Sequence, residues 1–255
     1  MPIGLAVPIL TLCLAGAAAA VWRLLYPLTD WAALALLLLA ALVLAGNWHV
    51  GIALRRARLH AALRAGSPLG RWWTGRLRAG LTAVVFVLIF LPLCAAQLLA
   101  ANAPELAIFA VLTFTTALLT CAARRLLLRH LHPPFATATA VTLASLICGA
   151  FFTPLMLYVT WALKSFPGDV RGAATIGEAA LAGLQGLPPH GGWIAEVLAP
   201  LHALDAIKLW LATREAWAAW GTLVFAAESA LFSFILARAA ALLSVIVAIM
   251  AGETP

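Results

Sequence analysis

The chain has 255 residues, of which 65% are apolar and only 10% charged, against about 25% charged in ordinary soluble domains. This composition excludes a soluble domain, because such a domain needs a charged surface that the chain cannot supply. The formal net charge of +7 comes mostly from Arg residues that flank apolar runs. That distribution is typical of membrane orientation and argues against nucleic-acid binding.

Apolar runs of about twenty residues, each long enough to cross a bilayer as a helix, recur along the chain. Short segments of alternating polarity, which a membrane β-barrel needs, are absent from the sequence. The sequence therefore predicts an all-α polytopic membrane bundle that forms one domain over 1–255. The predicted spans are 3–22, 31–54, 80–101, 106–123, 136–163 and 217–248.

The first and last apolar runs each allow two interpretations. No Lys or Arg precedes the first run, so we read it as a span and not as a signal peptide. The last run extends from Trp217 to Met250. At 1.5 Å per residue this is about 51 Å of helix, too long for a straight crossing. The run is therefore either strongly tilted or partly interfacial.

Charge predicts which loops face the cytoplasm. Loops 55–79 and 124–135 together carry ten Arg and no acidic residue, whereas segments 23–30, 102–105 and 164–216 carry seven acidic residues and five basic ones. By the positive-inside rule the two basic loops are cytoplasmic. Both termini are then cytoplasmic as well, segment 164–216 is external, and the expected location is the cytoplasmic (inner) membrane.

The external segment 164–216 is too short to form a stable core by itself. Its second half has apolar residues at three- and four-residue spacing, which predicts an amphipathic helix, and Pro200 is expected to form a corner. Two readings of this segment stay open. The helices lie in the outer membrane interface, or they pack on the bundle as ordinary helices.

Polar residues inside predicted spans are functional candidates, because burial in lipid is costly for them. The candidates are His49, Gln97, Glu228 and Arg238. Glu228 is the best of them: it could line a path, carry a proton or pair with another helix, although a hydrogen-bonded structural carboxylate is the favoured alternative. Arg238 is expected to extend towards the inner boundary.

Motifs for catalysis and for metal or cofactor binding are missing from the sequence. His130 and His132 stand among arginines that would repel a cation, and only His49 is placed as an intramembrane haem ligand would be. No GxSxG, HExxH or phosphate loop occurs. We therefore expect no catalytic residue, cofactor or metal, and no ATP hydrolysis by this chain.

The order of parts, with a long cytoplasmic loop after span two and external helices before span six, resembles the permease subunit of type-two ATP-binding-cassette exporters. Segments 60–80, 148–154 and 187–211 are similar to that family's coupling region, its span-five step and its run before the last span. The matching residues are Pro68, Arg71, Gly75, Gly149, Pro154, Pro189, Trp193, Pro200 and Leu201. Unlike the family, the chain has no amphipathic helix before span one and no Glu in the coupling region.

The resemblance implies that a separate cytoplasmic ATPase presses on the coupling loop while substrate passes between two permease copies. The loop residues that would meet the ATPase are Arg64, Pro68, Arg71, Gly75 and Arg76. A non-catalytic structural or assembly subunit of a larger membrane complex is the main alternative, favoured by the scarcity of intramembrane polar residues. A lipid-modifying enzyme would need Glu228, His49 or His130 to be essential.

Overall fold

The computed structural model describes residues 3–62, 75–163, 170, 172–185, 192–214 and 218–252. The regular elements in these ranges are all helices, which confirms the all-α prediction. They are α1 (Ile3–Leu25), the 3-10 helix η1 (Asp30–Ala32), α2 (Ala33–Ala62), α4 (Arg76–Ala100), α5 (Ala103–Leu127), α6 (Pro133–Leu163), α7 (Ile176–Gln185), α8 (Trp193–Thr213) and α9 (Ala218–Met250). Six of them, α1, α2, α4, α5, α6 and α9, are long and apolar enough to cross a membrane, so the chain is an integral membrane protein.

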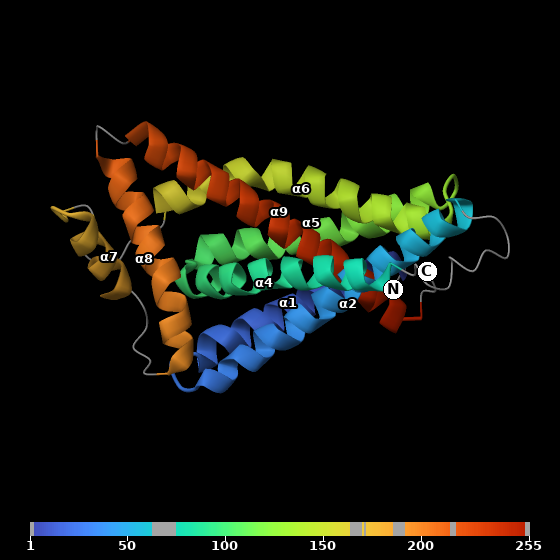
Figure 1. The fold of residues 1–255 in the computed structure, drawn as a ribbon, viewed down its shortest axis with the longest axis horizontal. Coiled ribbons are helices and arrows are strands. Elements are labelled where there is room, and N and C mark those ends of the chain that lie inside the picture. The colour runs from blue at the N-terminus through green and yellow to red at the C-terminus, as the bar shows by residue number, and fades with distance from the viewer. Residues whose placement is uncertain are drawn as a thin grey trace.

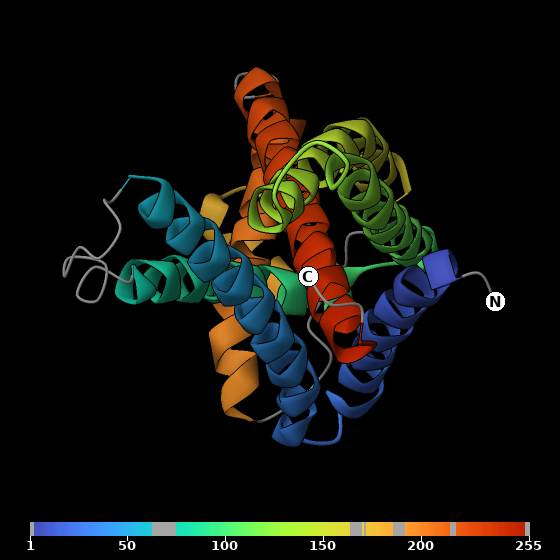
Figure 2. The ribbon, with the colours of Figure 1, turned by 90° about the vertical axis from the view of Figure 1, so that its right-hand side faces the viewer.

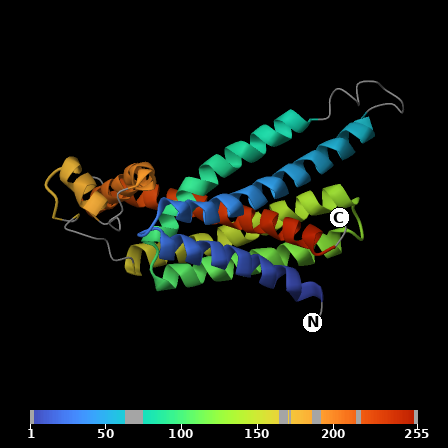
Figure 3. The same ribbon diagram turned by 90° about the horizontal axis from the view of Figure 1, so that it is seen from below.

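The six long helices form one bundle whose two ends differ. At one end α8 lies across the bundle, with α7 beyond it (Figure 1). We call this the capped end. The other end carries both ends of the chain, the turn between α5 and α6, and the far ends of α2 and α4 (Figure 3). We call it the basic end, because Arg55, Arg56, Arg76 and Arg124 lie there.

Helix α9 is the central helix of the bundle (Figure 2). It contacts α1, α2, α4, α5, α6 and α8. Its apolar stretch is 67% buried within the protein, whereas the other five spans reach 44% at most. α9 continues as one helix of 33 residues and runs obliquely through the bundle (Figure 1). α9 therefore crosses the bundle as one continuous, oblique helix.

Small residues let α9 approach its neighbours closely. A Cβ atom added at Gly46 of α2 would lie 2.5 Å from the backbone oxygen of Leu242. A Cβ at Gly149 of α6 would meet the ring of Phe234 in the same way. Small residues at such contacts are common between membrane helices, whose association relies on van der Waals packing.

Proline residues stand inside several helices without ending them. α8 continues through Pro200 from Trp193 to Thr213, so the corner expected at this proline does not form. Proline in a helix interior costs about 3 kcal/mol. In α8 this cost is offset by packing, because Ile194 and Leu198 before the proline and Leu209 after it are buried. Pro133 instead opens α6, where its missing N–H is not needed.

The outward faces of the spans carry large apolar side chains. Leu38 of α2, Leu88 of α4 and Phe151 of α6 are among the most exposed of them. In water such a surface would promote aggregation. In a bilayer these side chains contact lipid, so the exposed apolar faces agree with the membrane assignment.

Candidate functional site

An ion cluster joins α8 to α9 at the capped end. The Nζ atom of Lys208 lies 2.6 Å from Oδ1 of Asp205, one turn earlier in α8. It also lies 2.5 Å from Oε2 of Glu228 in α9. The Lys208 side chain is 16% exposed, so water screens these contacts only in part. The cluster therefore fixes the position of α8 relative to the central helix.

The environment of Lys208 favours its charged form. Burial lowers the pKa of the Lys208 ammonium, but the charges and hydrogen bonds of Asp205 and Glu228 outweigh burial and raise the pKa above its usual 10.5. Lys208 is therefore positively charged at neutral pH. With two formal negative charges against one positive, the cluster presents a net negative site.

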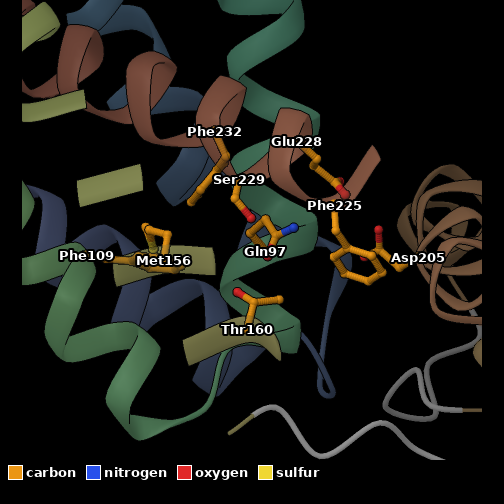
Figure 4. Close-up of a pocket in the computed structure, with 9 residues that line it drawn as sticks. All are labelled: Gln97, Phe109, Met156, Thr160, Asp205, Phe225, Glu228, Ser229 and Phe232. Atoms are coloured by element: carbon orange, nitrogen blue, oxygen red, sulfur yellow. The ribbon is translucent and has the colours of Figure 1, made fainter. Parts of the chain in front are cut away.

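A small polar cavity adjoins the cluster. Gln97 of α4, Thr160 of α6 and Ser229 of α9 line it together with Asp205 and Glu228. Its volume is about 30 Å³, which is room for a single water molecule. In Figure 4 the carboxylates of Glu228 and Asp205 lie at one side of the cavity and Gln97 and Ser229 near its centre. The apolar side is formed by Phe109, Met156, Phe225 and Phe232.

A further buried carboxylate, Glu105, lies behind Thr160. Glu105 is 2% exposed, and its Oε1 accepts a hydrogen bond of 3.1 Å from the Thr160 hydroxyl. Its Oε2 accepts from the backbone N–H of Asn102 at 2.9 Å, while the Asn102 side chain accepts from the backbone N–H of Glu105. This reciprocal pair is a capping box at the start of α5.

The four predicted intramembrane candidates do not form one site. Gln97 and Glu228 line the same cavity at the capped end. His49 lies at the basic end, beside two other cavities. Arg238 lies about 18 Å before the end of α9 at Met250, counting 1.5 Å per residue. The helix therefore continues well past Arg238 on the way to the basic end.

Two residues of the site are absent from the sequence-based candidates. Lys208 belongs to the segment predicted to be external, and nothing in its local sequence pattern indicates a partner twenty residues further along the chain. Glu105 has a usable signal, because Asn102 and Glu105 have the Asn-x-x-Glu spacing of a capping box. That spacing predicts the local bonds but not the contact with Thr160.

Only part of the predicted coupling loop can be placed. Arg64, Pro68 and Arg71 lie outside the described residues. Gly75 has a φ of 64°, in the left-handed region that favours glycine, and its carbonyl oxygen accepts a hydrogen bond of 3.0 Å from Arg55. Arg76 is the first residue of α4. This hydrogen bond holds Gly75, the residue before α4, against α2.

The chemistry available at the cluster is electrostatic. Within the described ranges, no group of three or more His, Cys, Asp or Glu side chains could hold a metal ion. The carboxylates and the ammonium group can attract or exclude ions, and they can open or close a contact between α8 and α9. The fold and this site together define an all-α integral membrane protein with a helical cap. No protein-family model, curated protein or solved structure matches the chain.

Proposed function

We propose that the chain is the membrane-spanning permease subunit of an ATP-driven exporter of the ATP-binding-cassette type. In this proposal a separate cytoplasmic ATPase supplies the energy, and a second permease copy completes the translocation path. The protein lies in the inner membrane with both termini in the cytoplasm. The basic end then faces the cytoplasm and the helical cap formed by α7 and α8 faces outwards.

The observation that carries the proposal is the extent of α2 at the basic end. α2 has 30 residues, about 45 Å of helix, whereas about 20 residues cross a bilayer. Figure 3 shows α2, with α4 beside it, diverging from the other helices towards that end. A partner can reach such a projection without entering the membrane, which is what a coupling region requires.

The ion cluster gives the cap a means to respond to movement in the bundle. α9 is the central helix, and Glu228 on α9 binds Lys208 on α8. A shift of α9 relative to its neighbours would therefore change the Lys208–Glu228 distance and move α8. This links the two ends of the molecule through one helix, as an alternating-access permease requires.

A second candidate function, a non-catalytic structural or assembly subunit, is favoured by a different observation. Several hydroxyl groups inside the spans bond to their own helices: Thr11 donates to the Val7 carbonyl and Thr120 to that of Thr116. The polar cavity next to Glu228 is only water-sized. Such spans can serve as a scaffold for neighbouring subunits.

A mild-detergent affinity purification of the tagged chain, followed by mass spectrometry, separates the two candidates. We expect a nucleotide-binding ATPase to co-purify and to be lost when Arg64, Arg71 and Arg76 are replaced by Glu. Arg129→Glu, in the other basic loop, is the control and should retain the ATPase. Co-purification of several unrelated membrane subunits without an ATPase would contradict the permease proposal and support the structural one.

A further inference from the structure

Two neighbouring cavities open at the basic end of the bundle. The larger, of about 720 Å³, lies between α2, the start of α4 and the end of α9. The smaller, of about 230 Å³, lies between α2, α5, α6 and α9. Both are lined by His49, Ala53 and Ile249. They therefore adjoin each other along α2, and we call the pair the basal groove.

The basal groove changes from apolar to cationic along α2. Leu44 and Ala45 line its deep part, Trp48 lies between, and Arg56 is at its rim. Leu44 and Arg56 are twelve residues apart, about 18 Å along the helix. Arg76 of α4 faces the same rim. The groove thus has an apolar channel that ends at two guanidinium groups from different helices.

The rim of the basal groove carries two exposed cations, Arg56 and Arg76. Among the residues that the structure describes, no acidic side chain lines either cavity. Guanidinium groups bind phosphate through paired hydrogen bonds, and basic pockets between transmembrane helices are typical sites for anionic lipid headgroups.

We propose that the basal groove binds one anionic phospholipid of the leaflet at the basic end. Its phosphate contacts Arg56 and Arg76, and one acyl chain lies along Leu44, Ala45 and Ile246. A soluble anion would leave the apolar channel empty, and a zwitterionic lipid would leave the charge of the rim uncompensated. The inference is independent of the proposed function, because it concerns the purified chain alone.

The test is native mass spectrometry of the full chain reconstituted in phosphatidylcholine with or without phosphatidylglycerol. We expect the wild type to retain phosphatidylglycerol and R56Q/R76Q to bind it about thirtyfold more weakly, which corresponds to about fivefold for each arginine. The control R58Q/R78Q also removes one positive charge from α2 and one from α4. Each control residue lies two positions along its helix, about 200° around the axis, and should leave binding unchanged.

A second variant distinguishes binding of the whole lipid from binding of its headgroup alone. Ala53→Phe keeps every charge but adds a large side chain at a residue that lines both cavities, so it should also release phosphatidylglycerol. The proposal is overturned if R56Q/R76Q and R58Q/R78Q lose the lipid equally, or if Ala53→Phe retains it. It is also overturned if inorganic phosphate or an acidic amphipathic peptide displaces phosphatidylglycerol, since either would assign the rim to another occupant.

Discussion

Lys208 is the residue through which the cap and the central helix are connected. It contacts Asp205 within α8 and Glu228 in α9. Exposed ion pairs contribute about 0–1 kcal/mol, whereas losing one partner of a buried pair costs about 3–5 kcal/mol. With side-chain exposures of 16% for Lys208 and 24% for Glu228, this pair falls between these cases.

Replacing Lys208 by Met is expected to lower the free energy of unfolding by about 1–3 kcal/mol, because two neighbouring carboxylates then lose their shared cation. Glu228→Gln should cost less, since Asp205 still balances Lys208. Thermal unfolding in detergent of both single variants and the double variant gives their coupling energy. A coupling energy near zero would show that the cluster does not join α8 to α9.

The same variant gives a pH test whose direction follows from the raised pKa of Lys208. A raised pKa stabilises the fold wherever Lys208 is charged, so the contribution is complete below 10.5 and is lost as the pH rises past that value. The difference in stability between wild type and Lys208→Met should therefore be constant near neutral pH and narrow in strong alkali. A difference that widened in alkali would contradict this assignment.

At the scale of elements, α9 determines the packing of the bundle, and its contact with α2 at Gly46 leaves no room for a side chain. The Cβ position of Gly46 faces the Leu242 backbone, which cannot rotate away as a side chain could. By contrast, a Cβ at Gly16 of α1 would have no atom within 4 Å. An alanine side chain therefore fits at Gly16 but not at Gly46.

Gly46→Ala is expected to force α2 away from α9 and to lower the free energy of unfolding by about 1–3 kcal/mol, the usual cost of overpacking. Gly16→Ala is the matched control and should be neutral or slightly stabilising, because alanine favours helix. Thermal unfolding of both variants in the same detergent tests this. Equal loss in both would show a general intolerance to added methyl groups, not a contact specific to α2 and α9.

At the scale of the whole molecule, the two ends have opposite character. Both ends of the chain lie at the basic end, while α7 and α8 cover the other (Figure 1). Arg55, Arg56, Arg76 and Arg124 also lie at the basic end. Six helices are long and apolar enough to cross a membrane, and six crossings would bring both termini to one side of it. By the positive-inside rule we expect the basic end to face the cytoplasm.

Reporter fusions test this orientation. Green fluorescent protein fused after Pro255 should fluoresce, because it folds in the cytoplasm, and alkaline phosphatase fused there should be inactive. Alkaline phosphatase inserted after Gln185, at the end of α7, should be active. The opposite pattern at both positions would mean that the basic end faces outwards.

Much of the fold could be predicted from sequence, but little of the site. Helical spans follow from apolar runs, because backbone groups in lipid must bond within their own segment. Glu228 and Gln97 were found as polar residues in such runs. Their proximity to each other and to Thr160 could not be found in this way, because it depends on how three helices pack.

The sequence by itself determined the class of protein, the spans and the asymmetry of charge, because these depend on local composition and on the cost of exposing polar groups to lipid. Only the tertiary structure decided that α9 is central, that α8 continues through Pro200, and that Lys208 pairs with Glu228. It also decided that Arg56 and Arg76 share one groove. The physical reason is that these features arise from contacts between segments distant in sequence, which periodicity and composition do not encode.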